Sequence, residues 1–256
     1  MTEVVREYMK LFMTSSPGGS ACVEGRWAAA PFDCTNDFLN LFRKACRGET
    51  DCLLISSDPD HAKMNDEMQR FFEEAFLASG MSVNRIDVCD RRNMQAADRL
   101  CCYGILILAG GHVPTQNTFF REIGLRERIH RYAGIVLGIS AGTMNCAEIV
   151  YSQPEEPGEA VNPYYMRYMQ GLGLSHVNVL PHFQNVKGAR LDGLRVLEDI
   201  SLPDSRVRPF YGLPDGSWLY RENGRTVLHG EAWLLEAGTC IRICEEGGTR
   251  EVEDER

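Results

Sequence analysis

The sequence lacks long hydrophobic runs, an excess of positive charge and any C-x-x-C pair of cysteines. No apolar stretch approaches the ~20 residues that a membrane span requires, and no basic segment followed by an apolar one marks a secretory signal. The net charge is -9 at pH 7, so the clustered Lys and Arg of a nucleic-acid or anionic-membrane surface are missing. We therefore expect a cytoplasmic protein that binds a small molecule, with neither nucleic acid nor membrane as a partner.

The ten cysteines are not spaced like those of a zinc-binding or disulfide-linked protein. No C-x-x-C pair occurs, so the spacing of a zinc knuckle or a redox dithiol is missing. Cys52, Cys89 and Cys146 lie inside apolar stretches, where a reduced thiol behaves as a small hydrophobic side chain. The sequence predicts buried free thiols there, no metal site and no cofactor.

Short apolar runs alternate with segments of helical period through the first part of the chain. This alternation predicts an α/β fold with a mostly parallel, doubly wound sheet and helices on both faces. The expected strands are Lys10–Thr14, Cys52–Ser56, Ser82–Val88, Gly104–Leu108 and Ile135–Gly138. The expected helices are Asn36–Cys46, Asp60–Ala78, Thr118–Tyr132 and Ala141–Val150.

The expected helix Asp60–Ala78 carries an apolar stripe of helical period. Stripes of this kind usually face a hydrophobic core, so we assign this one to the core and give it no role in binding. Its members are Met64, Met68, Phe71, Phe72 and Phe76.

The composition changes to that of antiparallel hairpins from about Tyr211. Asp215-Gly216 and the run 222–225 are turn sequences between short alternating strands, so the C-terminal third is expected to be antiparallel. The tail Glu245–Arg256 is charged and poor in apolar residues, and we expect it to fray. Without an internal repeat or a long linker, residues 1–256 are expected to form a single α/β domain.

The most informative segment is a G-x-S-x-G motif, Gly138-Ile139-Ser140-Ala141-Gly142, between an expected buried strand and an expected helix. A nucleophile elbow requires this context, because the serine sits in a strained turn and the glycines let strand and helix approach closely. In this interpretation Ser140 is a nucleophile, and the N–H of Ala141 points at a developing oxyanion. The alternative is a serine that caps an ordinary helix.

Two further features bear on this choice. The turn containing Gly110 and Gly111 ends the preceding expected strand, and the carboxyl ends of neighbouring parallel strands share one crevice. Either glycine N–H is therefore a candidate second oxyanion donor.

His182 follows the apolar run Val177–Pro181, at a strand end that opens into the same crevice. Alone, each feature also has a structural interpretation, as a plain turn or a strand-end histidine.

The sequence resembles the peptidase E and cyanophycinase group of serine peptidases from Lys10 to about Leu228. The resemblance rests on five patches: Leu11–Ser16, Ala109–Gly111, Gly138–Gly142, Leu180–Phe183 and Gly212–Trp218. That family uses a Ser-His-Glu/Asp triad on a sheet like that of class I glutamine amidotransferases. The resemblance implies that Ser140 is the nucleophile, His182 the general base and Asp215 the acid that orients it.

The acid and the substrate contacts are less fixed by the resemblance. The family has Glu where Asp215 stands, and three glutamates after the expected elbow helix are rival acids: Glu155, Glu156 and Glu159. The family's glycine turn normally runs directly into Asn or Asp and Thr, whereas His112-Val113-Pro114 intervenes here before the segment that contains Asn117, a candidate substrate contact. The family's specificity arginine, which recognises an acidic side chain, is matched by Arg190, with an exposed surface role as the alternative.

The resemblance implies hydrolysis of a small peptide, such as an aspartyl dipeptide, through an acyl-enzyme on Ser140. One alternative is an amidase or cyanophycin-like isopeptidase that uses the same triad, because a triad does not specify which amide is cut. The other is a non-catalytic binding module of amidotransferase-like fold. The expected partner is a small peptide, and a homodimer is left open.

Overall fold

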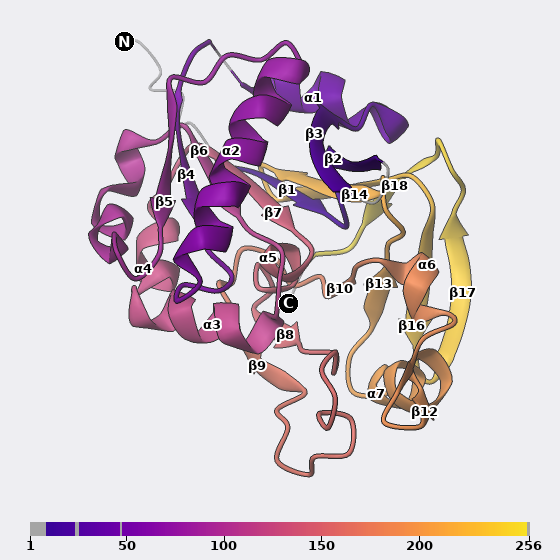
Figure 1. Ribbon diagram of the computed structural model, residues 1–256. Coiled ribbons are helices and arrows are strands. Elements are labelled where there is room, and N and C mark those ends of the chain that lie inside the picture. Colours follow the sequence, from indigo (N-terminus) through magenta and orange to yellow (C-terminus); the bar gives the residue numbers. More distant parts are fainter. Residues whose placement is uncertain (1–8, 24–25, 47, 255–256) are drawn as a thin grey trace, which may run out of the picture.

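A computed structural model describes residues 9–23, 26–46 and 48–254 of the protein. An eight-stranded sheet forms its centre (Figure 1). The strand order is β18-β15-β14-β1-β7-β6-β4-β5. Five neighbouring strands are parallel: β1 (Lys10–Thr14), β7 (Ile135–Ile139), β6 (Ile105–Leu108), β4 (Asp51–Ile55) and β5 (Arg85–Cys89). Three are antiparallel: β14 (Trp218–Glu222), β15 (Arg225–His229) and β18 (Thr249–Val252). The fold class is therefore α/β, as predicted, with an antiparallel C-terminal extension.

Helices cover both faces of the sheet, and successive strand residues alternate between the two cores. Phe12 packs in the core beneath α1 (Phe38–Ala45) and α2 (Ala62–Ala78), whereas Leu11 and Met13 pack in the opposite core. A short 3-10 turn, Thr35–Asp37, precedes α1. The opposite face carries the 3-10 segment Met94–Cys102, α3 (Val113–Glu122) and α4 (Leu125–Ile129).

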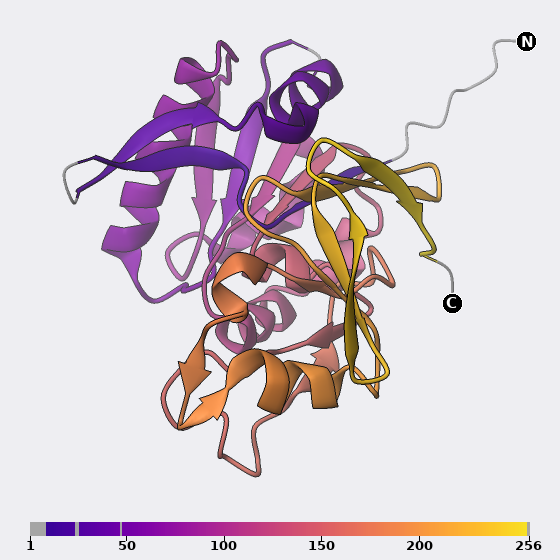
Figure 2. The same ribbon diagram turned by 90° about the vertical axis from the view of Figure 1, so that its right-hand side faces the viewer.

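A second, four-stranded sheet lies beside the first and is built from the C-terminal part of the sequence (Figure 2). It consists of β10 (Val179–Leu180), β13 (Phe210–Gly212), β16 (Ala232–Glu236) and β17 (Thr239–Cys244). Three hairpins complete the strands: β2 (Gly18–Val23) with β3 (Arg26–Phe32), β8 (Ile149–Tyr151) with β9 (Tyr168–Gln170), and β11 (Arg190–Leu191) with β12 (Leu194–Arg195). The short helices are α5 (Ala141–Met144), α6 (Phe183–Val186) and α7 (Leu202–Asp204), the last after a π-helical turn, Val196–Ser201.

All five expected strands are present, but two expected helices differ from their predictions. The segment Thr118–Tyr132 contains parts of two helices, α3 and α4, because the chain breaks at Gly124, where φ is 57°. The expected helix Ala141–Val150 ends at Met144, because residues 149–151 pair with β9 instead. Apolar runs of that length suit a buried strand as well as a helix, so periodicity alone could not separate them.

The C-terminal part corrects the expectation of a frayed tail. The hairpin β14–β15 turns at Asn223 and Gly224, both at positive φ, as the turn sequence predicted. Beyond it, residues 249–252 form β18, which pairs with β15. Asp254 is 7% exposed and accepts hydrogen bonds from the hydroxyls of Ser175 and Thr226. A charged segment is held here by edge pairing and a buried carboxylate, which its composition does not reveal.

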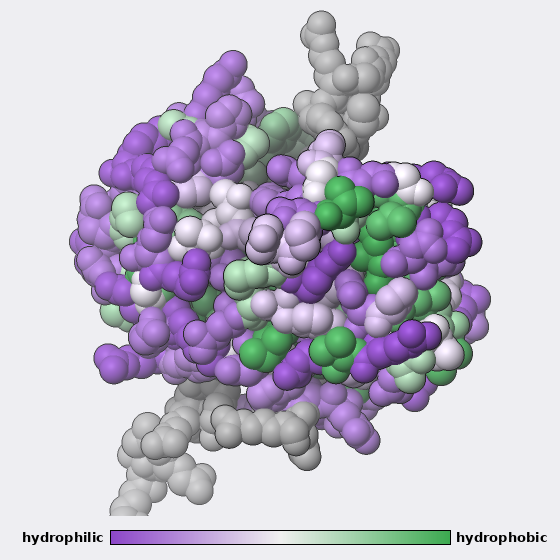
Figure 3. Space-filling view, turned by 90° about the horizontal axis from the view of Figure 1, so that it is seen from below, coloured by the Kyte–Doolittle hydropathy of each residue, from purple (hydrophilic) through white to green (hydrophobic). Residues whose placement is uncertain are grey.

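The buried-thiol prediction is confirmed, since Cys52, Cys89 and Cys146 are all buried and free. Burial raises the pKa of Cys52 and of Cys89 to about 12, so both are uncharged at neutral pH. In the part of the chain that the structure describes, no helix combines the length and the apolar character needed to cross a membrane. The face seen from below is mostly hydrophilic, with apolar side chains in small groups (Figure 3).

Candidate active site

Ser140 occupies a strained turn between the end of β7 and the start of α5. Its backbone has φ 50° and ψ -111°, a conformation that costs energy for any residue with a Cβ. Close packing explains both flanking glycines. A Cβ on Gly142 would lie 2.1 Å from the carbonyl oxygen of Leu108, and one on Gly138 would lie 3.0 Å from the Cα of Thr143. The G-x-S-x-G segment therefore has the geometry of a nucleophile elbow.

Ser140, His182 and Asp215 form a continuous hydrogen-bonded chain. His182 follows β10, begins α6 and has φ 52°. Its Nε2 lies 3.0 Å from the Oγ of Ser140, and its Nδ1 lies 2.7 Å from Oδ1 of Asp215. Ser140 follows β7 of the eight-stranded sheet, whereas His182 and Asp215 follow β10 and β13 of the four-stranded sheet, so the site lies where the two sheets meet. This order of contacts is that of a serine nucleophile, a base and an acid that orients the base.

Two side chains that the sequence analysis did not single out hold this arrangement. Ser15 donates from Oγ to Oδ1 of Asp215 at 2.8 Å and accepts the backbone N–H of His182 at 2.8 Å. Gln184 donates to the other carboxylate oxygen of Asp215 at 2.7 Å. The available signals were weak: Ser15 lies within the first patch of the family resemblance, and Gln184 lies two residues after His182.

Asp215 is ionised at neutral pH. Partial burial acts to raise its pKa, but the hydrogen bond and charge of His182 and the hydrogen bonds from Ser15 and Gln184 outweigh burial, so the pKa lies below its usual value. An ionised carboxylate beside Nδ1 keeps the proton on that nitrogen and leaves Nε2 free to accept a proton from Ser140.

The candidate oxyanion donors lie around the nucleophile. A Cβ on Gly110 would be 3.5 Å from the Cβ of Ser140, so the glycine turn closely approaches the elbow. The carbonyl of Gly110 accepts the hydroxyl of Ser57 at 2.6 Å, which holds the turn in place. A Cβ on Gly111, where φ is 153°, would lie 2.4 Å from the same hydroxyl oxygen. Ala141 contributes the first amide of α5, and such amides have no acceptor within their own helix.

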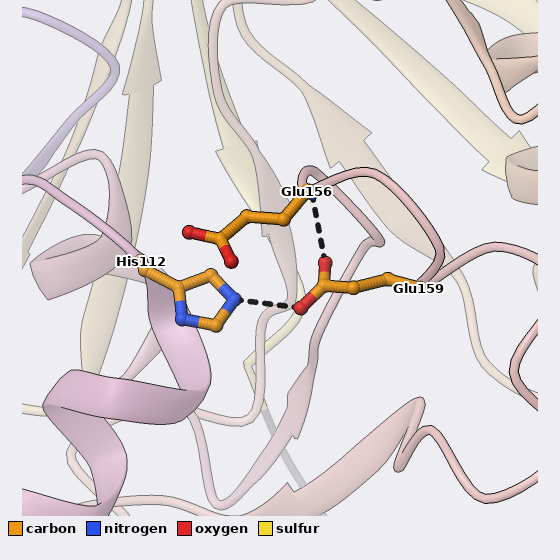
Figure 4. A group of neighbouring side chains, drawn as sticks. All are labelled: His112, Glu156 and Glu159. Atoms are coloured by element: carbon orange, nitrogen blue, oxygen red, sulfur yellow. Dashed lines mark hydrogen bonds and ion pairs between the residues drawn. The ribbon is translucent and has the colours of Figure 1, made fainter.

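The three rival glutamates lie in one loop, and Figure 4 shows two of them, Glu156 and Glu159, beside His112. Oε1 of Glu159 accepts a hydrogen bond from Nε2 of His112 at 2.9 Å, and the other carboxylate oxygen accepts the backbone N–H groups of Glu155 and Glu156. Thr115 contacts Nδ1 of the same imidazole at 2.8 Å. Asp215, and none of these glutamates, makes the hydrogen bond to His182. The loop is therefore tied to the glycine turn through His112.

One group among the described residues has the composition of a metal site. Ligand atoms of His112, Glu156 and Glu159 lie within 4.8 Å of one another. Two carboxylates and an imidazole suit several divalent ions. His112 and Glu159 already satisfy each other by hydrogen bonding, and Glu156 is exposed, so we assign no ion to this group.

The two expected substrate contacts have different surroundings. Asn117 on α3 is 4% exposed, and its amide nitrogen donates to Oδ1 of Asn145 and to the carbonyl of Gln170, both at 2.9 Å. Arg190 is exposed on the β11–β12 hairpin, where it lies opposite Arg195 in the strand pairing. Its charge interacts electrostatically with Asp199. Binding of substrate by either residue remains a prediction.

Comparisons with known proteins identify the fold and the family. A peptidase E from Salmonella arizonae is 30% identical over 155 residues, which is 56% of this chain and 63% of that protein. The structure of a peptidase from an acI-B1 actinobacterium superposes with a TM-score of 0.65 at 13% identity, covering 96% of this chain and 97% of the other. A putative peptidase E from Listeria monocytogenes gives 0.57 at 13% identity, covering 92% and 98%. The profile of Peptidase family S51 matches residues 53–229, and this protein therefore belongs to that family.

Proposed function

We propose that this protein hydrolyses a small peptide through an acyl-enzyme on Ser140. The observation that carries the proposal is the 3.0 Å contact between the Oγ of Ser140, in its strained turn, and Nε2 of His182. A serine hydroxyl is a weak nucleophile until a neighbouring base accepts its proton. Membership of Peptidase family S51 supports peptide bonds as the substrate class.

In the first half of the reaction, the Oγ of Ser140 attacks the carbonyl carbon of the scissile amide while Nε2 of His182 takes the hydroxyl proton. The N–H groups of Ala141 and of Gly110 or Gly111 stabilise the oxyanion that develops on the carbonyl oxygen. As the carbon–nitrogen bond breaks, His182 gives its proton to the departing amine. The products of this step are a free amine and an ester on Ser140.

In the second half, His182 removes a proton from a water molecule that attacks the ester. The ester bond breaks, and the proton returns from His182 to the Oγ of Ser140 as the carboxylic acid leaves. Asp215 stays ionised throughout and stabilises the imidazolium formed in each half, without taking the proton itself.

Two side chains are proposed contacts for the substrate. We retain Arg190 as a proposed contact for a substrate carboxylate and Asn117 as a proposed contact near the glycine turn. An amidase or isopeptidase acting through the same residues remains the alternative within enzymes, because a triad does not select the amide.

Labelling with a fluorophosphonate tests the proposal directly, because only an activated serine reacts. We expect one label on Ser140, located by peptide mass spectrometry, and release of amino acids from a panel of dipeptides. If Ser140 stays unlabelled and no peptide or amide is cleaved, the protein is a binding module of the same fold.

A further inference from the structure

A cavity of about 270 Å³ opens beside Ser140 on the side of α2. Met68, Phe71 and Phe72 of α2 form one wall, and Ile139, Gly110 and residues 16–20 form the rest. Gly110 also approaches the nucleophile, since a Cβ on it would lie 3.5 Å from that of Ser140. The cavity therefore begins where the reacting carbonyl would be held.

The lining of this cavity suits an uncharged group. None of the described residues that line it carries a charge, and the polar side chains among them are the hydroxyls of Ser16 and Ser20. A carboxylate placed there would lose its hydration without gaining a cationic partner. Pockets for whole small ligands begin at roughly 300 Å³, so this cavity fits one large side chain of a longer substrate.

The wall formed by α2 departs from the expectation that its apolar stripe is all core. Phe76 is fully buried at 0% exposure, as expected. Met68, Phe71 and Phe72 are only partly buried and line the cavity, although Met68 and Phe72 also pack against the core. Apolar area left in contact with water is stabilised when another apolar surface covers it. A substrate side chain in the cavity would provide that cover.

His182 is not among the described residues that line the cavity. Met68, Phe72 and Ile139 pack against the core beneath α1 and α2. Val179 of β10, three residues before His182, packs in the core of the other face, and Leu180 packs in a third cluster with Phe183. The departing amine must lie within reach of His182 to receive its proton. We place the acyl side chain in the cavity beside α2, which His182 does not line.

Carboxylates lie near the catalytic histidine. Glu155 interacts electrostatically with both His112 and His182, and Glu159 contacts His112. An acidic residue at the scissile bond would be repelled by these carboxylates, because like charges placed close together oppose binding. The cavity on its other side has no charged lining residue that could attract it. Both surroundings favour an uncharged acyl residue.

Building on the proposed peptidase function, we propose that this cavity binds a large apolar side chain of the residue that contributes the scissile carbonyl. The substrates are then small peptides with Leu, Met or Phe on the acyl side of the cleaved bond. Met68, Phe71 and Phe72 determine this specificity, and they act on the side chain rather than on the reacting atoms.

The test compares Leu-Ala, Asn-Ala and Asp-Ala, because the side chains of Leu, Asn and Asp have nearly the same shape and differ in polarity and charge. We expect kcat/KM for Leu-Ala to exceed that for the other two by at least about tenfold. The variant Met68→Arg places a cation in the cavity, so it should lower kcat/KM for Leu-Ala at least about tenfold and reduce the discrimination against Asp-Ala. Leu77→Arg is the matched control, because Leu77 is 78% exposed on the same helix and lies outside the cavity.

Fluorophosphonate labelling of Ser140 separates failure of this inference from failure of the proposed function. If Ser140 is labelled but Asp-Ala is cleaved as well as Leu-Ala, or Met68→Arg behaves like Leu77→Arg, the apolar subsite is wrong and the hydrolase remains. If Ser140 is not labelled and the protein is inactive, calorimetry with Leu-Ala tests whether the cavity still binds an apolar side chain. Binding that Met68→Arg weakens supports the cavity, and absence of binding overturns it.

Discussion

Gln184 holds Asp215 at two points. Its Nε2 donates to Oδ2 of the carboxylate at 2.7 Å, and its Oε1 accepts the backbone N–H of Asp215 at 3.1 Å. Both residues are exposed, so this pairing orients a carboxylate that solvent would otherwise leave mobile. Together with Ser15, it leaves Oδ1 directed at His182.

Ser140→Ala should lower kcat by roughly 10⁴- to 10⁶-fold on any substrate, because the members of a triad act as a unit. The elbow should still fold, since the smaller side chain removes one hydrogen bond to His182 and adds no atom. Steady-state kinetics and circular dichroism check the two halves of this prediction. Near wild-type turnover by the alanine variant would contradict the assignment of the nucleophile.

Asp215→Asn should cost on the order of 10⁴ in kcat, because an amide beside Nδ1 favours the wrong imidazole tautomer. Glu159→Gln is the matched control, since it neutralises a nearby carboxylate that contacts His112 rather than His182. The kinetics of both variants should be measured on the same peptide. A larger loss for Glu159→Gln would transfer the orienting role to the glutamate loop.

The depressed pKa of Asp215 predicts a pH-dependent contribution to stability. Its pKa in the folded protein lies below the value of about 3.9 expected in the unfolded chain. Ionised Asp215 therefore stabilises the fold above about pH 4, and this contribution is lost as the pH falls through the folded pKa. Because its side chain is 45% exposed, solvent reduces the effect. The difference in Tm between wild type and Asp215→Asn should shrink at low pH, and a constant difference would argue against the shift.

Gly142→Ala should destabilise the protein by at least about 1–3 kcal/mol, because its Cβ would lie 2.1 Å from the carbonyl oxygen of Leu108. The glycine turn should shift as well, with loss of activity. Gly188→Ala serves as the control, since no described atom lies within 4 Å of its Cβ, and its expected change is within about 0.5 kcal/mol. Chemical denaturation measures both, and equal stabilities would show that the elbow accommodates a methyl group.

Arg190→Ala should weaken transition-state binding of peptides with an acidic side chain, measured from kcat/KM, by less than about 1 kcal/mol. Arg190 is exposed, and an exposed ion pair contributes little. A buried pair that loses one partner would cost about 2–5 kcal/mol instead. The measurement compares acidic and neutral dipeptides, with and without added salt. A loss in the larger range, confined to acidic peptides, would make Arg190 the specificity residue.

The strands and the turn residues could be predicted because their signals are local. The apolar runs that became β1, β4, β5, β6 and β7 have the length and composition of buried strands, and Asn223-Gly224 is a strong turn sequence. The hairpin β2–β3 and the strand β18 were not predicted, because their partners determine them and their composition does not.

Within the site, the G-x-S-x-G motif identified Ser140, and the family resemblance pointed to His182 and Asp215. Ser15 and Gln184 were missed, because a single serine or glutamine has no distinctive spacing, and only the folded chain brings them to Asp215. The apolar stripe of α2 was assigned wholly to the core, because period alone cannot tell a buried face from the wall of a cavity.

The position of β1 determines the order in which this protein can fold during synthesis. β1 lies between β7, its parallel partner, and β14, its antiparallel partner, which is translated much later. Until β14 leaves the ribosome, one side of β1 is an unpaired edge that can associate with other chains. Asp215 also emerges shortly before β14, long after Ser140. Between residues 140 and 215, the nascent chain therefore carries Ser140 without Asp215, and the hydrogen-bonded chain of Ser140, His182 and Asp215 can form only after Asp215 has emerged.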